Sequence, residues 1–164
     1  MSIQVIDNFL PESIFKKIQS ELMGNSFPWY YYQQILWDHP ESDSKKYQFV
    51  HQFYKEESQE KSFGFSIIEP LIIKLNVKKI IKIKSNLTPR HFEHRNSGYH
   101  IDGCACPLTS IFYINTNNGW TEFRKGDRVD CKENRILIFD SNLEHTAVTC
   151  TDENVRVVVN LNYE

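Results

Sequence analysis

Two early stretches of the chain carry apolar side chains at the spacing of an α-helix. The first has clear boundaries, because Pro11 suits the first helical position, Glu12 suits the positive end of the helix dipole, and Gly24 is typical of a helix end. Its apolar face consists of Ile14, Phe15, Ile18 and Leu22. The second stretch, residues 62–76, predicts another packing helix, and Pro70 should start or kink that helix.

From about residue 79 onward, apolar and polar residues alternate in short runs between turn signals, which is the pattern of β-strands. In the last run, Arg156, Val158 and Asn160 share one face. The predicted strands are 79–86, 99–102, 108–115, 120–124, 134–140, 145–150 and 155–162, with earlier ones at 3–7 and 47–53. Helices followed by many short strands predict an α+β, mainly β fold with a sandwich or small barrel as its core. No repeat or linker interrupts the chain, so we predict a single domain over residues 1–164.

A run of aromatic residues at 27–32 follows the first predicted helix. Aromatic side chains are good strand formers, and we favour a strand that covers one side of a sheet. The same run could instead bind a partner, which would make the protein a non-catalytic β-sandwich binding module. The polar stretch at 38–46 is compatible both with a lid over a site and with an ordinary surface loop.

Composition excludes several classes of protein. The residues are 40% hydrophobic and 13% aromatic, which is typical of a folded chain, and a net charge of −2 gives no electrostatic case for nucleic-acid binding. No run approaches the ~20 apolar residues of a membrane span, and the first residues do not resemble a secretory signal. We therefore expect the four cysteines to be reduced thiols in the cytoplasm.

The strongest candidate for chemistry is the segment Tyr99-His100-Ile101-Asp102, taken together with His145. Alternation along a strand places His100 and Asp102 on the same face, so both can reach one ion. Two imidazoles and one carboxylate are the ligands of the facial triad that holds non-haem iron(II) and leaves coordination positions open. We therefore predict that His100, Asp102 and His145 bind iron and form the catalytic centre.

Two cysteines close to this pair, Cys104 and Cys106, leave open the alternative of a zinc-bound, cupin-like protein. Structural zinc sites prefer cysteines separated by two to four residues, and the sequence has no second pair to complete such a site. Beside His145, the polar residues Asp140 and Asn142 are candidates for hydrogen bonds that support a metal ligand.

Arg156 is flanked by valines in the last predicted strand, where a charge is costly unless a partner meets it. The planar guanidinium pairs with a carboxylate through two parallel hydrogen bonds. That carboxylate could belong to an acidic side chain of the protein, or the guanidinium could lie at a strand edge in water. Together with the metal triad, an arginine 11 residues after His145 (156 − 145) is placed where a co-substrate carboxylate would be held.

These motifs, in this order, resemble the iron(II)- and 2-oxoglutarate-dependent oxygenases. The similarity is greatest to prolyl 4-hydroxylases and to small oxygenases of phages and marine viruses. It covers nearly the whole chain and is carried by residues 5–10, 99–102, 113–115, 119–123 and 134–140, together with His145 and Arg156. The resemblance implies a double-stranded β-helix, the jelly roll of cupins, with N-terminal helices packed on one sheet.

The resemblance also implies a reaction. Fe(2+) would be held by the triad, and Arg156 would bind the far carboxylate of 2-oxoglutarate. With O2, such an enzyme hydroxylates a C–H bond of a peptidyl, prolyl-like substrate or of a small molecule, and releases succinate and CO2. Many relatives have a tyrosine about ten residues before the first ligand, where this chain has Arg90; Asn86 or Tyr113 could replace its contact with 2-oxoglutarate.

Overall fold

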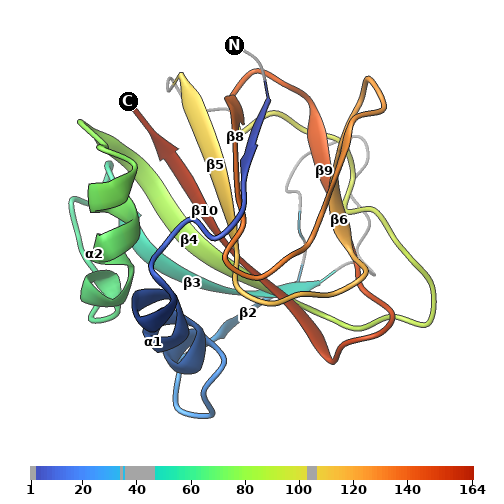
Figure 1. The fold of residues 1–164 in the computed structure, drawn as a ribbon, viewed down its shortest axis with the longest axis horizontal. Helices are drawn as coiled ribbons and strands as arrows, with labels where there is room; N and C mark the ends of the chain where they lie inside the picture. The colour runs from blue at the N-terminus through green and yellow to red at the C-terminus, as the bar shows by residue number, and fades with distance from the viewer. Residues whose placement is uncertain (1–2, 34, 36–46, 103–106) are drawn as a thin grey trace.

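The described part of the chain is built mainly from short β-strands (Figure 1). The computed structural model describes residues 3–33, 35, 47–102 and 107–164. Its elements in chain order are β1 (Gln4–Ile6), α1 (Glu12–Leu22), β2 (Tyr30–Tyr32), β3 (Gln48–Lys55), α2 (Phe65–Lys74), β4 (Ile80–Pro89), β5 (Leu108–Tyr113), β6 (Trp120–Phe123), β7 (Arg128–Asp130), β8 (Ile136–Asp140), β9 (His145–Val148) and β10 (Val155–Tyr163). The predicted loop at 38–46, Cys104 and Cys106 lie outside the described residues.

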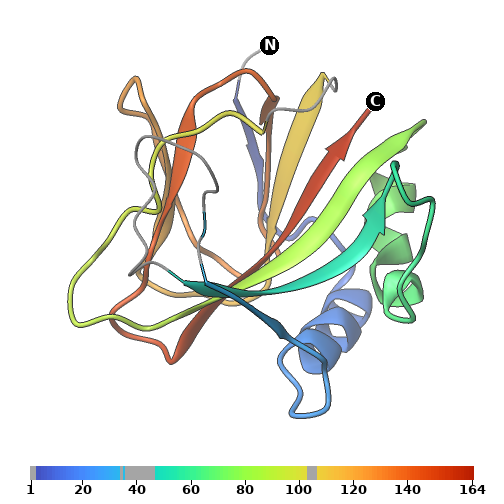
Figure 2. The same cartoon turned by 180° about the vertical axis from the view of Figure 1, so that it is seen from behind.

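The strands form two antiparallel sheets. The larger has seven strands in the order β1-β8-β5-β10-β4-β3-β2, and the smaller has three in the order β7-β6-β9. Isolated bridges from Asn96 and His100 to β9 add a further segment to the smaller sheet. The chain passes back and forth between the two sheets, as in a jelly roll. Both views of the ribbon show the helices on one side of the larger sheet and β6 and β9 on the other (Figures 1 and 2).

The mainly β architecture is therefore confirmed, with two local differences from the sequence prediction. Residues 99–102 do not form a regular strand, because His100 alone pairs with His145. The strand β7 was not expected, since its three residues are too few to show a periodicity. None of the described helices is long and apolar enough to cross a membrane.

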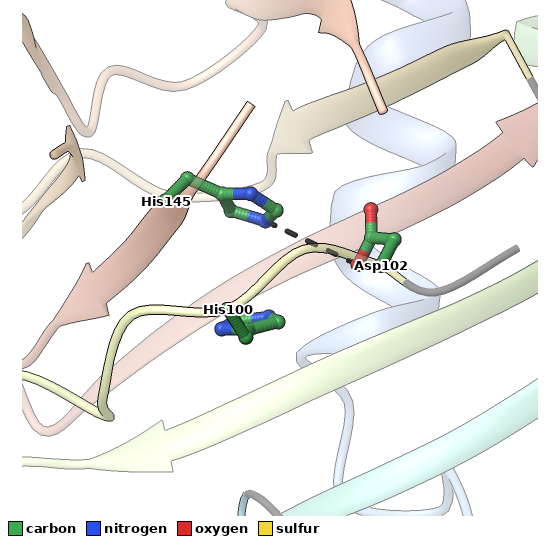
Figure 3. A group of neighbouring side chains, drawn as sticks. All are labelled: His100, Asp102 and His145. Atoms are coloured by element: carbon green, nitrogen blue, oxygen red, sulfur yellow. Dashed lines mark ion pairs between the residues drawn. The ribbon is translucent and has the colours of Figure 1, made fainter. Parts of the chain in front are cut away.

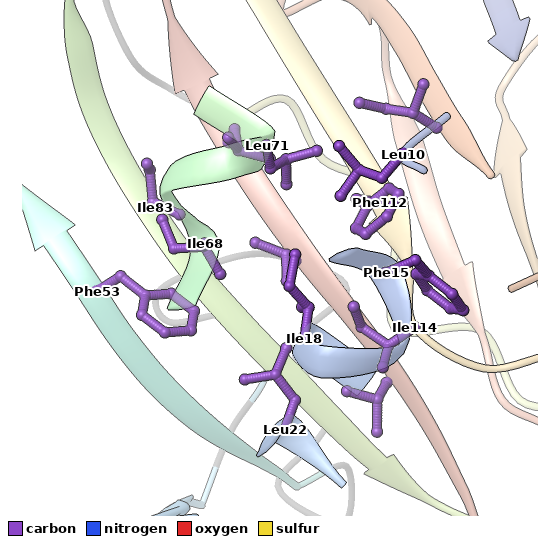
Figure 4. Close-up of a cluster of buried hydrophobic side chains, with 14 of the residues drawn as sticks. Leu10, Phe15, Ile18, Leu22, Phe53, Ile68, Leu71, Ile83, Phe112 and Ile114 are labelled. Carbon is purple, nitrogen blue, oxygen red and sulfur yellow. The ribbon is translucent and has the colours of Figure 1, made fainter. Parts of the chain in front are cut away.

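One large hydrophobic cluster joins both helices to the larger sheet (Figure 4). In α1, the buried side chains are three of the four predicted, namely Phe15, Ile18 and Leu22. They pack with Ile68 and Leu71 of α2 and with sheet residues that include Ile83, Phe112, Val157, Val159 and Leu161. Each fully buried side chain of this size contributes about 1.5–3 kcal/mol relative to exposure, so this face supplies much of the stability.

The helix α2 continues through Pro70. The helix therefore does not start at Pro70, which was one of the two outcomes predicted from the sequence. Five residues of the helix precede the proline, and two of them, Phe65 and Ile68, are buried in the large cluster. Pro70 disfavours the helical turn before it because proline has no N–H to donate. Burial of Phe65 and Ile68 stabilises that turn.

The aromatic run divides between the core and the surface. Phe27 is buried in the large cluster and Trp29 packs against it. The following residues form β2 at the edge of the larger sheet, where Tyr30 and Tyr31 are each 60% exposed. His51 on β3 bonds Pro28 O at 3.0 Å and Ser62 Oγ at 2.9 Å, so its role is structural.

Candidate active site

The three predicted metal ligands lie close together, with His145 at the start of β9 and His100 and Asp102 on the segment that precedes β5 (Figure 3). One ligand atom from each of His100, Asp102 and His145 falls within 4.8 Å of the others, and His145 Nε2 lies 4.0 Å from Asp102 Oδ1. The backbones of the two histidines exchange a pair of hydrogen bonds, each 3.0 Å long. This ladder fixes the two imidazoles side by side, with ring centroids 4.6 Å apart.

Hydrogen bonds to backbone carbonyls set the tautomer of both histidines. His100 Nδ1 lies 3.1 Å from Gly98 O, and His145 Nδ1 lies 3.0 Å from Leu143 O. Because a carbonyl oxygen only accepts, each Nδ1 carries the proton and each Nε2 keeps a lone pair for an ion. Burial, assisted by the neighbouring His145, lowers the pKa of His100 to about 4, so its ring is neutral at pH 7.

Asp102 is held as an ionised carboxylate by two donors. Thr109 Oγ1 donates to Asp102 Oδ2 at 2.6 Å, and Asn162 Nδ2 donates to the same oxygen at 2.9 Å. Burial alone would raise the pKa of Asp102, but His145 and these two hydrogen bonds outweigh it and keep the pKa below its ordinary value. The other oxygen, Oδ1, is left to face His145.

These supporting residues were missed by the sequence analysis, which named Asp140 and Asn142 as candidates. In the structure, Asn142 donates from its backbone N–H and from Nδ2 to Asp140 Oδ1, both at 3.0 Å, so the two residues pair with each other. The support for His145 comes instead from Leu143 O and from the ring of Phe139, whose centroid is 4.8 Å away. Asn162 continues the alternation of Arg156 and Asn160 along β10, which is the signal that could have identified it.

The triad shares a cavity of about 170 Å³ with Arg156. Arg156 is only 2% exposed, and its Nε and Nη2 donate to Cys131 Sγ at 3.1 Å and Thr121 Oγ1 at 3.3 Å. No carboxylate in the described part of the chain pairs with this guanidinium, so a buried positive charge faces the cavity without a counter-charge.

Gly119 leaves room for the Arg156 side chain. A Cβ at this position would lie 3.2 Å from Arg156 Cδ and 2.7 Å from the carbonyl oxygen of Val148. Gly119 does not have a positive φ. The glycine is required because its lack of a side chain allows this close approach.

The two further candidates for co-substrate contact are in different positions. Asn86 lines the cavity, and its Oδ1 is buried without a hydrogen-bond partner. Tyr113 is fully buried behind the cavity wall, where its hydroxyl donates to Thr121 Oγ1 at 2.8 Å. Thr121 also accepts from Arg156, so Tyr113 acts on the guanidinium through Thr121.

No protein-family model matches the sequence, and no curated protein matches it. Solved structures match its fold over nearly the whole chain. The viral collagen prolyl hydroxylase of Paramecium bursaria Chlorella virus-1, in complex with 2-oxoglutarate, has a TM-score of 0.65 at 12% identity, covering 99% of this chain and 95% of its own. The fold is that of the iron(II)- and 2-oxoglutarate-dependent oxygenases.

Two other structures of this fold class show its breadth. A prolyl hydroxylase from Trichoplax adhaerens, bound to a peptide of hypoxia inducible factor, has a TM-score of 0.60 at 16% identity, covering 98% of this chain and 83% of its own. SnoN, a non-haem α-ketoglutarate-dependent epimerase of nogalamycin biosynthesis, has a TM-score of 0.63 at 12% identity, covering 99% of this chain and 77% of its own. The resemblance read from the sequence is thus confirmed at the level of the fold, and the fold alone leaves the reaction and substrate open.

Proposed function

We propose that this protein is an iron(II)- and 2-oxoglutarate-dependent dioxygenase. It would hydroxylate a C–H bond of a peptidyl, prolyl-like substrate or of a small molecule. The proposal places the site on a single double-stranded β-helix domain, 1–164, whose larger sheet is backed by the helices. One observation carries it: three side chains whose ligand atoms could hold one metal ion, and a buried arginine without a counter-charge, line the same small cavity.

The donor set fits iron(II). Two neutral imidazole nitrogens and one ionised carboxylate are the ligands of the non-haem iron triad, and they leave coordination positions open. His100, Asp102 and His145 would therefore hold the metal, and Thr109 and Asn162 would keep the carboxylate of Asp102 oriented toward it.

Arg156 fits the far carboxylate of 2-oxoglutarate. Its guanidinium can form two parallel hydrogen bonds with a carboxylate, and the anion would supply the missing counter-charge. Thr121 and Cys131 hold Nη2 and Nε, so the fork has a fixed direction before the co-substrate arrives. Asn86, with its unpartnered Oδ1, is the remaining candidate of the sequence analysis that lines this cavity.

Iron(II), 2-oxoglutarate and O2 together supply an oxidation in which one oxygen atom enters the substrate C–H bond and the other enters succinate, with release of CO2. The protein's contribution is to bind, orient and exclude water. Ile111 and Val158 form an apolar part of the cavity wall, which limits the water that can reach the reacting centre.

Anaerobic titration with iron(II) and then 2-oxoglutarate tests the proposal. We expect a weak visible charge-transfer band in the wild type and none in Asp102→Ala. Asp140→Ala is the matched control, since that carboxylate pairs with Asn142 outside the triad, and it should keep the band. The absence of a band in the wild type, or equal bands in wild type and Asp102→Ala, would reject the function.

A second candidate is the non-catalytic binding module. It is favoured by the exposure of Tyr30, Tyr31 and Tyr32 on the edge strand β2, because aromatic side chains at an open sheet edge can bind a partner. If this module were the function, Tyr31→Ser would abolish partner binding, whereas His100→Ala would leave both metal content and partner binding unchanged.

A further inference from the structure

A second polar position lies on the cavity wall, away from Arg156. Lys84 on β4 and Asn160 on β10 are direct partners in the antiparallel register, and both line the cavity. The Oδ1 atom of Asn160 is buried and accepts no hydrogen bond. Buried acceptors of this kind are costly unless a ligand or water meets them, so the atom points to a missing donor.

The charges of the cavity wall show a second imbalance. Its described lining contains four cationic side chains, Lys82, Lys84, Arg95 and Arg156, and one acidic side chain, Asp102. Only Arg95 among the cations has a carboxylate partner in the described part of the chain, at 3.1 Å from Glu93. The chain as a whole has more acidic than basic residues, 21 against 19, so this concentration of positive charge is local to the cavity.

One dicarboxylate does not balance these charges. If the proposed function holds, 2-oxoglutarate supplies one carboxylate to Arg156 and the other to the metal. Lys84 and Lys82 then still line the cavity, and no carboxylate of the described residues forms an ion pair with either of them. Burial, with the like charge of Lys82, lowers the pKa of Lys84 to about 8, and the charge of Asp102 only partly offsets this. A second anion at this position would relieve the cost of the partly buried ammonium.

We propose that Lys84 and Asn160 bind the carboxylate and the amino group of an α-amino acid, which is the substrate of the proposed oxygenase. The inference rests on the proposed function and narrows its substrate class. Lys84 Nζ only donates, so it requires an anion or acceptor, and Asn160 Oδ1 only accepts, so it requires an N–H. A free α-amino acid carries both charged groups on one carbon, whereas the end of a peptide carries only one of them and an internal peptide residue carries neither.

The spacing keeps this position separate from the co-substrate. Cross-strand partners have Cβ atoms about 4.5–5.5 Å apart, so one small zwitterion can reach both side chains. Arg156 and Asn160 are four residues apart on β10, about 13 Å along the strand. Arg156 and the Lys84–Asn160 pair therefore approach the cavity from different ends, and each can hold its own anion.

Calorimetry under anaerobic conditions tests the proposal without turnover. The whole chain, loaded with iron(II) and 2-oxoglutarate, is titrated with each of the twenty free L-amino acids, with their amides and with the amines that lack the carboxylate. We expect at least one amino acid to bind, and its amide and amine to bind at least about tenfold more weakly, because each loses a charged hydrogen bond.

The variants assign the binding to the two side chains. Lys84→Met and Asn160→Leu should each weaken binding of that amino acid by about tenfold or more, and Lys84→Arg should restore part of it. The affinity for 2-oxoglutarate, titrated separately, should stay within about twofold of wild type in all three. Lys78→Met, an exposed lysine just before β4, is the matched control and should change neither affinity. Thermal unfolding checks that each variant is folded.

Three outcomes separate this proposal from the function on which it rests. If 2-oxoglutarate binds and no amino acid binds, the substrate proposal is overturned and the oxygenase stands. If Lys84→Met weakens 2-oxoglutarate as much as it weakens the amino acid, Lys84 belongs to the co-substrate and the proposal is also overturned. If an amino acid binds through Lys84 while 2-oxoglutarate does not bind, the amino-acid position is supported and the oxygenase function fails.

Discussion

The two faces of strands β4 and β10 differ in chemistry although they belong to the same backbone. The helix-side face, which carries Ile83, Val157, Val159 and Leu161, is apolar and is buried in the cluster that includes α1 and α2. The cavity-side face carries Lys84, Asn86, Arg156 and Asn160, all of which line the cavity. Strict alternation along paired strands separates the two sets.

The difference between the two faces shows how the fold accommodates a site that lowers the free energy of unfolding. Asn86 and Asn160 each have a buried oxygen without a hydrogen-bond partner, and Arg156 has a buried charge without a counter-charge; such groups reduce stability. The helix-side face offsets this cost by burying large apolar side chains against two helices. Substitutions on the two faces should therefore have separable effects, on unfolding for one face and on binding for the other.

The largest effect should come from the helix-side cluster. Phe15 of α1 is fully buried and packs edge-on against Phe112 of β5, with ring centroids 6.0 Å apart. Phe15→Ala should lower the free energy of unfolding by ~3–5 kcal/mol in urea titrations. The 2-oxoglutarate affinity of the folded fraction should not change, and Lys17→Ala, on the exposed side of α1, should alter neither quantity. A loss of affinity without a loss of stability would break the distinction between the faces.

The opposite response is expected from Arg156→Met on the cavity side. Removing a charge-assisted pair with a carboxylate should weaken 2-oxoglutarate binding by about 100-fold, about 2.7 kcal/mol, in anaerobic calorimetry. The free energy of unfolding should stay the same or rise, because a buried charge without a counter-charge is removed. Arg156→Lys keeps the charge but loses the planar guanidinium, so its affinity for 2-oxoglutarate should lie between those of wild type and Arg156→Met. Destabilisation without a change in affinity would assign Arg156 to the core.

The protonation of His100, which lines the same cavity, makes the free energy of unfolding depend on pH. In the metal-free protein, burial holds the pKa of His100 at about 4, below the value of about 6.5 in the unfolded chain. Between these values only the unfolded state binds the proton, so the free energy of unfolding should fall as pH decreases from about 6.5 to 4, by the order of 2 kcal/mol. His51 on the helix side also has a pKa lowered by burial and adds to the slope. The test therefore compares how the free energy of unfolding of wild type and of His100→Gln depends on pH. The dependence should be flatter in His100→Gln over this range.

The alternation along β10 made the cavity-side face of Arg156 and Asn160 readable from sequence. The His-x-Asp spacing and the later His145 gave the triad in the same way, because a strand places alternate residues on one face. Residues 99–102, however, do not form a regular strand. The pairing that brings the ligands together is one bridge between His100 and His145, which depends on the smaller sheet as a whole.

Contacts between distant segments could not be predicted. The bond from Asn162 to Asp102 spans 60 positions, and no local pattern encodes it. The same limit explains the choice of Asp140 and Asn142, which are near His145 in sequence but bond each other. Pro70 was expected to start or kink a helix, and the helix extends before it because tertiary burial of Phe65 and Ile68 outweighs local preference.

The smallest effect should come from a residue that touches neither the metal nor the helices. Asn162 is 4% exposed and donates to Asp102 Oδ2 at 2.9 Å and to Thr109 Oγ1 at 3.0 Å. Asn162→Leu keeps a similar volume and removes one of the two donors that orient the carboxylate. Loss of such support costs about 10–100-fold in metal affinity, and the remaining bond from Thr109 places the expected loss near tenfold.

Competition with a coloured chelator measures the iron(II) affinity of this variant. Asn160→Leu makes the same substitution two residues earlier on the same face of β10, but Asn160 has no bond to Asp102, so it should keep the wild-type affinity for iron(II). Equal losses in the two variants would mean that any polar residue lost from this face weakens the metal site. A loss confined to Asn162→Leu would show that the cavity-side face acts through individual hydrogen bonds, whereas the helix-side face acts through the apolar area that it buries.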